Sequence, residues 1–527
     1  MKRLIKLSLM LMVCANFSQA QVASGSFGYY QEALLFGRTT PGGTARIQAI
    51  GGAQVALGGD ISSAYSNPAG LGFFNRSEFT FTPSVNFQDS ESNFLNTNTK
   101  SFKNKFSFNN MGIVFKNTSN EGKFKGGVFG ISVNKINEFA NEYRYEGVNG
   151  NNSIVDSFIE RAGSTDSQNL SGFEAIAYEH FLIDLDDEST TPNYVVSPDG
   201  SILVPVAGDG SYEQYASPFG NFEGSLPKQE GTVESSGAQY QWNFSYGANY
   251  DDKLYFGAAL GVQTINYERK RTYIESDFRF SSDNSFDDLI NSIRIDDKLN
   301  ITGTGVNATF GLIARPADFL RIGISYVTPT ALNLSEESSF DFVTDWNPSY
   351  FYALPDDTVQ LGNISTKSDL FVSNYSLRTP SRLTTGLAFF LGKHGFISGD
   401  VEFVNYGKSQ LKSTDFSPTA DNRSISNLYT NTMNYRVGGE YRYDMFRLRA
   451  GYAYQGDPFA DGSIDRSIQS ISGGIGVRID DMFVDLAITN TVSDALYKPY
   501  ELSNNLEPGA IVKNKATNVA VTVGFKF

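Results

Sequence analysis

The stretch GTARIQAIGGAQVALGGDISSAYSNPAGLGFF, residues 43–74, organises the rest of the chain. Paired glycines at positions 51–52 and 58–59 interrupt any apolar stripe of helical period, and alanine supplies many of the other small residues. Asn67 precedes Pro68, so its backbone is pushed out of the helical region and the stretch ends in a rigid turn. A backbone this small suits close packing inside another structure. We therefore predict a plug over residues 43–74, surrounded by a barrel of strands that begins after it.

The first 20 residues have the three parts of an export signal. They comprise a basic start with Lys2, Arg3 and Lys6, an apolar run over Leu7–Val13, and the small-residue cleavage site Ser18-Gln19-Ala20. We predict a signal peptide over residues 1–20 and cleavage before Gln21. No cysteine would remain, because the chain contains one cysteine, in its first 20 residues, so a disulfide framework is not expected.

Composition narrows the class of protein. The formal net charge is −15, which argues against nucleic-acid binding because that function needs a basic surface. No segment approaches the roughly 18 consecutive apolar residues of a membrane helix. The chain has 42 Phe and 28 Tyr against 2 Trp, an aromatic content that fits girdles around an outer-membrane barrel.

Alternating apolar and polar residues over several stretches predict strands joined by short turns. The first strand is expected at Ser77–Phe87 and the last at Val519–Phe527, where a terminal Phe on an alternating strand resembles the signal read by the barrel assembly machinery. Strands are also expected at Gln239–Asn249 and Leu254–Tyr267, and hairpins over residues 111–133, 303–329, 382–406, 435–454 and 468–490. Short turns that alternate with long polar loops are typical of outer-membrane barrels, and the count is about 12–16 strands.

Between the early and the central strands lies a long region rich in Asn, Ser, Asp and Gly, at about residues 138–237. Short helices are predicted within it at Ser153–Ala162 and Gly172–Ile183, and a further helix at Ser285–Ile295. Two interpretations of the loop helices stay open. They pack the loop for solubility, or they form a lid or landing site for an apolar ligand.

The segment GGAQVALGGDISSAYSNPAGL resembles the N-terminal hatch of the long-chain fatty acid transporter (FadL) family of outer-membrane barrels. The match consists of the Gly- and Ala-rich residues before Asp60, Asp60 itself, the triplet Asn67-Pro68-Ala69 and the apolar Leu71. The resemblance implies an all-β fold: a transmembrane antiparallel barrel of fourteen strands with an N-terminal plug in its lumen and long extracellular loops that carry short helices. It also implies a hatch over residues 21–76, a barrel over residues 77–527, and a gating role for Asp60, Asn67, Pro68 and Ala69.

Arginines occupy the polar face of several predicted strands. A charge that faced lipid at mid-depth would cost about 2–4 kcal/mol, so these side chains are expected to face the lumen. The candidates are Arg321, Arg382, Arg436, Arg447 and Arg449, with Arg442 and the acid Glu440 on the same faces. Two roles remain open for these arginines. They form ion pairs that stabilise the wall and the plug, or their planar guanidinium groups bind the carboxylate of an amphipathic ligand.

No residue pattern nominates catalysis, a metal site or a cofactor. His180 and His394 lack metal-ligand spacing and are predicted to be ordinary surface residues. The chain is not expected to be an enzyme.

The first functional hypothesis is a channel in the outer membrane of a Gram-negative bacterium that takes up hydrophobic compounds such as long-chain fatty acids, gated by the hatch. Outer-membrane lipid, lipopolysaccharide and the barrel assembly machinery are the expected partners, and a monomer is expected. The alternatives are a scaffold that binds exported proteins in a secretion system, and a receptor for haem or another hydrophobic ligand.

Overall fold

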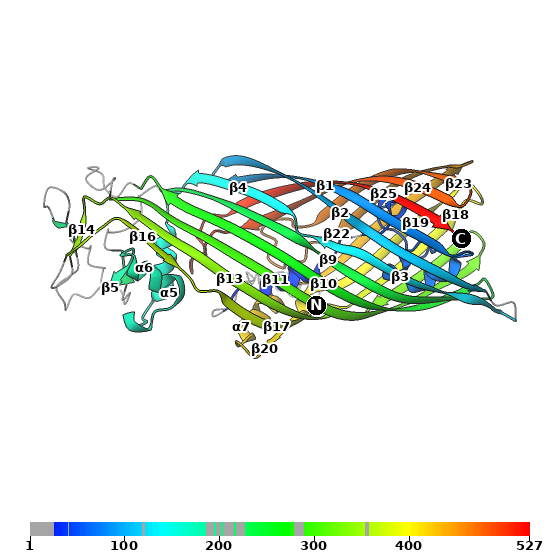
Figure 1. Ribbon diagram of the computed structural model, residues 1–527, viewed down its shortest axis with the longest axis horizontal. Helices are drawn as coiled ribbons and strands as arrows, with labels where there is room; N and C mark the ends of the chain where they lie inside the picture. Colours follow the sequence, from blue (N-terminus) through cyan, green and yellow to red (C-terminus); the bar gives the residue numbers. More distant parts are fainter. Residues whose placement is uncertain are drawn as a thin grey trace, which may run out of the picture.

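The computed structural model describes residues 26–40, 42–118, 122–185, 194–196, 202–203, 215–217, 227–278, 289–353 and 358–527. The chain forms one long barrel (Figure 1). The end that carries the C-terminus and the short turns is called the turn end, and the end that carries the long connections is called the loop end.

Fourteen antiparallel strands close into the barrel wall, as predicted. Strand β1 pairs with β2 on one side and with β25 on the other, so Glu78 lies opposite Lys526 and the sheet has no free edge. The wall strands at the turn end, in chain order, are β1 (Glu78–Phe94), β2 (Thr97–Thr118), β3 (Phe124–Glu138), β9 (Lys228–Tyr250), β10 (Leu254–Ser276), β11 (Ile290–Ala317), β12 (Leu320–Val327), β18 (Arg382–Phe390), β19 (Gly395–Asn405), β21 (Asn431–Tyr443), β22 (Phe446–Gln455), β23 (Ile468–Ile479), β24 (Met482–Tyr497) and β25 (Ala510–Lys526).

Further strands extend part of the wall toward the loop end. They are β4 (Asn141–Val148), β13 (Ala331–Trp346), β16 (Asn363–Lys367), β17 (Phe371–Arg378) and β20 (Gln410–Ser413). Strand β11 is long enough to pair with β12 near the turn end and with β13 farther along. Two small sheets complete the loop end: β6 (Tyr194–Val196), β7 (Ile202–Leu203), β14 (Phe351–Ala353) and β15 (Thr358–Gln360) form one, and β5 (Asp184–Leu185) and β8 (Tyr215–Ala216) form the other.

Side chains alternate across the wall as the period of two requires. Large apolar side chains point outward on strand after strand and leave an apolar belt on the outer surface, which includes Phe81, Phe106, Phe129, Phe244, Phe256, Phe310, Ile324, Leu387, Ile397, Val437, Leu448, Ile475, Ile488 and Phe525. Their neighbours along each strand are buried in the lumen and are mostly hydroxyl, amide or charged residues, such as Thr80, Asn243, Ser398 and Thr522. The predicted faces of β21 and β22 are confirmed, since Tyr441 and Leu448 are exposed whereas Glu440 and Arg449 are buried.

The helices are short and lie in the lumen or at the loop end. They are α2 (Tyr30–Gly37), α3 (Ala45–Ala49), α4 (Ser63–Ser66), η1 (Pro68–Phe73), α5 (Ile154–Ala162), η2 (Ser167–Asn169), α6 (Gly172–Glu179), η3 (Tyr406–Lys408) and α7 (Thr419–Leu428). Helix α5 confirms its prediction and begins with a capping box. The Asp156 carboxylate accepts from the N–H of Ser153, and the Ser153 hydroxyl accepts from backbone N–H groups of the first turn. Helix α6 begins where it was expected and ends four residues earlier than predicted. No helix in the described ranges is both long enough and apolar enough to cross a membrane.

The helix predicted at Ser285–Ile295 is wrong over its described part. Residues from Ile290 onward belong to β11, where Ile293 pairs with Glu275 of β10 and with Thr344 of β13. Backbone pairing with neighbours on both sides outweighs the local helical signal, and isoleucines favour the extended form. Ser285 lies outside the described residues.

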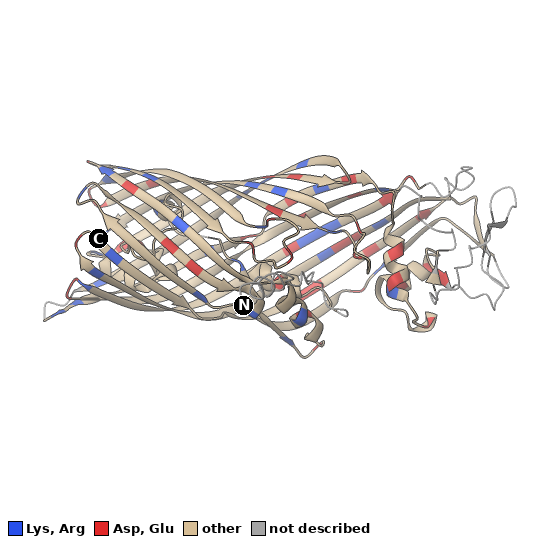
Figure 2. Ribbon diagram, turned by 180° about the vertical axis from the view of Figure 1, so that it is seen from behind, with Lys and Arg blue, Asp and Glu red and all other residues tan. Residues whose placement is uncertain are grey.

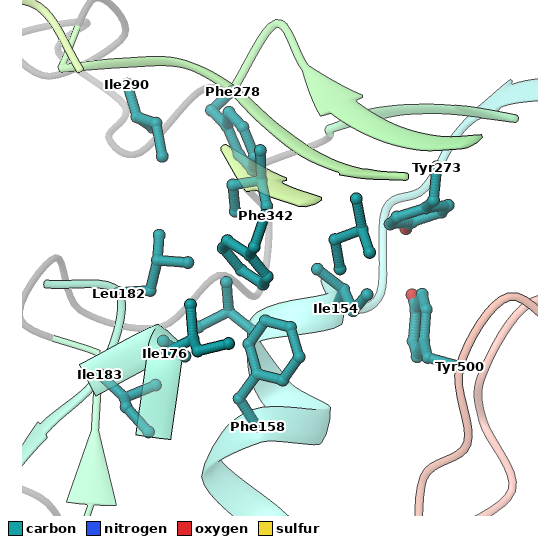
Figure 3. Close-up of a cluster of buried hydrophobic side chains, with 14 of the residues drawn as sticks. Ile154, Phe158, Ile176, Leu182, Ile183, Tyr273, Phe278, Ile290, Phe342 and Tyr500 are labelled. Atoms are coloured by element: carbon teal, nitrogen blue, oxygen red, sulfur yellow. The ribbon is translucent and has the colours of Figure 1, made fainter. Parts of the chain in front are cut away.

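The largest apolar core lies at the loop end, where α5 and α6 pack against the long strands (Figure 3). Phe158, Ile176, Leu182 and Phe342 lie at its centre, and Tyr273 and Tyr500 flank it. The two helices carry Asp156, Glu160, Glu174 and Glu179 against one arginine, which accounts for the red segments there in Figure 2.

Candidate functional site

The plug segment, residues 43–74, fills the lumen near the turn end. It consists of α3, α4 and η1 joined by tight turns, and Gly51, Gly52, Gly58 and Gly59 adopt positive φ angles of 66°, 78°, 68° and 70°. An L-residue with a Cβ atom rarely adopts this conformation, so the paired glycines are what allow the chain to fold back on itself. All six alanines in the segment are fully buried.

Glycines on the inner wall make room for the plug segment. A Cβ atom built at Gly257 of β10 would lie 2.4 Å from the carbonyl carbon of Pro68, and one at Gly438 of β21 would lie 2.2 Å from the oxygen of Ile50. Such contacts are impossible for a real side chain, so the plug backbone touches the wall backbone directly. The wall glycines that contact plug backbone in this way are Gly247, Gly257, Gly323, Gly438 and Gly451, on five different strands. At Gly311 and Gly474 an added Cβ atom would instead meet the side chains of Asn67 and Ala49.

Asn67 ties the plug segment together and to the wall. Its Oδ1 accepts from the N–H of Ala69 and so caps η1. Its Nδ2 donates to the carbonyl of Val55 at 2.7 Å and contacts the carbonyls of Leu312 and Ile324 at 3.4 and 3.3 Å. Pro68 occupies the first position of η1, where its missing N–H costs nothing.

Asp60 is buried and organises the plug segment internally. Its carboxylate accepts from Thr44 Oγ1 at 2.9 Å and from the N–H of Ser62 at 2.9 Å. Arg46 of α3 lies 3.8 Å from the same carboxylate and 3.4 Å from Glu440 of the wall. Of the predicted hatch residues, Asp60 therefore joins separate parts of the plug segment, and Asn67 also reaches β11 and β12. Arg46 connects the segment to β21.

Three wall side chains that sequence analysis did not nominate accept hydrogen bonds from backbone N–H groups of the plug segment. Asp400 accepts from the N–H groups of Gln54 and Val55 at 2.8 and 3.0 Å. Ser472 accepts from Gly51 at 3.1 Å and Thr522 from Ala45 at 2.7 Å. Parity alone places these side chains in the lumen, but only the packed plug shows which of the many inward polar residues reach it.

Two of the arginine candidates contact the N-terminal region directly. Arg321 lies between the rings of Phe73 and Phe390, at 3.9 and 4.2 Å from their centroids, and donates to the carbonyl of Leu57. Arg382 donates to the carbonyl of Gly37 and to Thr39 Oγ1.

The other arginines pair mainly with wall residues. Arg436 Nη2 donates to Glu402 at 3.1 Å. Arg449 is fully buried and donates to Glu440 and to Asp485, each at 2.7 Å. Arg447 lies apart from this group and donates to the turn carbonyls of Asp444 and Phe446. These contacts favour the bracing role over a ready-made carboxylate site.

The arm, residues 26–40, runs from the side of the barrel toward the plug segment and contains α2. Its first described residue, Ser26, contacts α7, and α7 lies about half-way along the barrel (Figure 1). Asp421 of α7 accepts from Ser26 Oγ at 2.7 Å and from the N–H groups of Phe27 and Tyr30 at 3.3 and 3.2 Å, so it caps α2 from another part of the chain.

A cavity of about 70 Å³ lies where the arm, the plug segment and the wall meet. The arm contributes Phe36, Thr39 and Thr40, and the plug segment contributes Gln54, Val55 and Tyr65. The wall contributes mostly polar residues, which include Gln241, Gln263, Asn307, Thr330, Arg382, Glu402 and Arg436.

The prediction for His180 is wrong, whereas His394 is exposed as expected. His180 is fully buried at the end of α6, with its ring nitrogens 3.0 Å from Thr344 Oγ1 and 2.8 Å from Thr366 Oγ1. Burial lowers its pKa from 6.5 to about 4. Among the described residues, no group of three or more His, Cys, Asp or Glu side chains is placed to hold a metal ion.

No family model and no curated protein matches the chain. The solved structures with a similar fold include a FadL homologue and a TodX channel. A Pseudomonas aeruginosa FadL homologue is 12% identical, covers 93% of this chain and 100% of its own length, and gives a TM-score of 0.52. A deltaS2 mutant of the TodX monoaromatic hydrocarbon channel is 12% identical, covers 92% and 99%, and gives 0.50. This chain is therefore a closed barrel with the fold of the FadL homologue and TodX.

Proposed function

We propose that this protein is a channel in the outer membrane of a Gram-negative bacterium, that it takes up hydrophobic compounds, and that the plug segment is its gate. The observation that carries the proposal is that the plug segment fills a closed barrel and packs directly against glycines of the barrel wall. The apolar belt supports insertion in a membrane, because the outward apolar side chains would otherwise face water.

The similar structures support the choice of cargo. One is named a FadL homologue and the other a monoaromatic hydrocarbon channel, and neither name describes an enzyme. Long-chain fatty acids and small aromatic hydrocarbons are therefore the first compounds to test on this chain.

The contacts between plug segment and wall are suited to a movable gate. Close backbone packing and a few hydrogen bonds hold the segment, and each such bond contributes only about 0.5–1.5 kcal/mol net. The hydrogen bonds that the backbone N–H groups of the segment donate to Asp400, Ser472 and Thr522 can be exchanged for bonds to water as the segment shifts. Gating by movement of the whole region 21–76 is the mechanism that we propose.

A reversible cross-link tests the gate. Ala49 of α3 and Ala487 of β24 belong to one small buried cluster, so cysteines at both positions are expected to form a disulfide that fixes the plug segment to the wall. Oxidised A49C/A487C protein in liposomes should take up labelled oleic acid or toluene at least about tenfold more slowly than the reduced protein. The single variants A49C and A487C are the controls. Equal uptake in both redox states would exclude movement of this part of the segment.

A scaffold for exported proteins is the second candidate, favoured by one observation. The described part of the loop end contains a buried apolar core and two acidic helices that pack against it. Capture of an exported protein by residues 138–237, without retained lipid in the barrel, would support it. The arrangement of His180 does not favour a haem receptor, because both ring nitrogens already face threonine hydroxyls.

A further inference from the structure

The arm carries a buried glutamate that lies beside a second buried glutamate of the wall. Glu32 of α2 is 7% exposed and Glu336 of β13 is 9% exposed. The hydroxyl of Tyr375 on β17 donates to Glu32, and its oxygen also lies 3.4 Å from Glu336 Oε2. The two carboxyl groups form a hydrogen bond with each other as well. An acidic pair therefore joins the arm to the wall, inside the apolar cluster that surrounds α2.

Hydrogen-bond chemistry decides the protonation of this pair. An ionised carboxylate only accepts, so two ionised carboxylates cannot bond each other. Tyr375 has one hydroxyl proton, which can satisfy one of the two acids but cannot join them. At least one of the two acids therefore holds a proton while the arm is docked, as in other sites where two close carboxyl groups cannot both ionise.

The acidic pair lies beyond the apolar belt. Along β11, toward the loop end, the exposed side chains change from Phe310 and Val306 to Thr304 and Thr302. The partner of Glu336 on β11 is the next residue, Ile301, on the loop-end side of this change. The pair therefore belongs to the loop-end part of the wall and not to the membrane-spanning part.

The charges around the pair do not replace its proton. Among the described residues, the titratable groups that face it are Arg269 and Tyr267 of β10, Tyr375 of β17 and Tyr29 of the arm. Arg269 favours ionisation, but it also lies 3.7 Å from Asp297 of β11. Asp421 of α7 binds the first turn of α2 instead. Burial and the charge of Glu336 raise the pKa of Glu32, and burial raises the pKa of Glu336.

We propose that the proton shared by Glu32 and Glu336 is a latch, which holds the arm against the wall in acidic medium and releases it as the medium becomes alkaline. An acid whose pKa is higher in the docked arm than in the free arm favours docking fully below its usual value of 4.5. That contribution is lost as the pH rises through the raised value. The inference rests on the proposed function, because the arm leads into the plug segment and its release frees that end of the gate.

A spin label on the arm tests the latch without any cargo. Gln31 is an exposed residue of α2, so Q31C can carry the label without disturbing the buried face of the helix. The parent protein is the full chain in detergent with Q31C and without Cys14, which leaves a single thiol. The mobile fraction of its electron paramagnetic resonance spectrum should rise at least about threefold between pH 5 and pH 8.5.

Two variants remove the shared proton from either side. E32Q and E336Q should each lose most of that rise, because an amide donates to the remaining acid and does not titrate. E337Q is the matched control and should keep the rise, since Glu337 is the next residue of β13 and is exposed. E32Q changes only the arm, so it keeps the test valid if E336Q fails to fold.

An unchanged spectrum in the parent protein, or an equal rise in the parent, E32Q and E336Q, would overturn the latch. Uptake of labelled oleic acid by liposomes at the same two pH values separates this result from the proposed function. Release of the arm without uptake at either pH would support the latch and remove the channel. Uptake with the arm docked at both pH values would remove the latch and leave the channel.

Discussion

At the residue scale, the inward arginines show that one factor decides which face of the wall a side chain occupies and another decides which residue it pairs with. Alternation along β22 places Arg449 in the lumen whatever else the barrel contains. Its two carboxylate partners, Glu440 and Asp485, come from different strands, and Glu440 is shared with Arg46 of the plug segment. A buried ion pair of this kind stabilises mainly because losing one member leaves the others unpaired.

Replacing Arg449 with methionine should destabilise the barrel by about 3 kcal/mol, at the low end for a broken buried pair, because Arg442 and Arg478 still face the two acids. Urea unfolding in detergent measures the change. R447M is the control, since Arg447 donates only to turn carbonyls, and it should shift the free energy of unfolding by less than about 0.5 kcal/mol. Similar values for the two variants would contradict the buried network.

His180 should make the loop end sensitive to acid. Its pKa is about 4 in the folded state against 6.5 ordinarily, so the unfolded form binds the proton more readily across that interval. Stability from the neutral ring is complete above pH 6.5 and is lost as the pH falls toward 4. Amide hydrogen exchange over residues 150–183 should therefore be faster at pH 5 than at pH 7. H180Q, which can bond both threonines without titrating, should lose most of that difference.

At the element scale, the plug segment is stable only against the wall that holds it. Its helices have five, four and six residues, too few to be stable alone in water. Wall glycines replace side-chain packing with direct backbone contact, and Asp400, Ser472 and Thr522 accept hydrogen bonds from the backbone N–H groups of the segment. The strands and the plug segment are thus complementary in sequence: small residues occur on both sides of one interface.

A single methyl group in that interface should loosen the plug segment. G257A places a Cβ atom 2.4 Å from Pro68, and backbone on both sides cannot yield. Proteolysis within residues 43–74 of the folded protein should increase severalfold. G399A is the matched control, because the nearest atom to its new Cβ lies 3.6 Å away. Equal rates of proteolysis in the two variants would show that the added methyl group does not loosen the contact between the plug segment and the wall.

At the scale of the whole molecule, closure of the sheet decides the environment. All fourteen strands have both neighbours, and most of the exposed large apolar side chains among the described residues lie on the outward face of the wall. That face is continuous around the barrel. The lumen is filled by the plug segment, by the arm with an apolar cluster around it, and by the loop-end core.

The apolar belt should make the folded chain dependent on detergent or lipid. Refolding into micelles should give a protein whose gel mobility in SDS changes only after heating, as expected of a closed hydrogen-bonded barrel. Dilution into buffer without detergent should cause aggregation. Recovery of a water-soluble folded monomer without detergent would contradict membrane insertion, and with it the proposed function.

The sequence by itself determined what depends on local period: the strands, their short turns, the inward direction of Arg321, Arg382, Arg436 and Arg449, and a glycine-rich segment that could not be an ordinary helix or strand. Only the tertiary structure decided what depends on contacts between distant residues. It converted residues 290–295 into strand, buried His180, and brought Gln54, Asn307 and Arg436 around one cavity. The physical reason is that alternation along a strand is a property of the backbone, whereas partner and burial are set by chain segments hundreds of residues apart when the barrel closes.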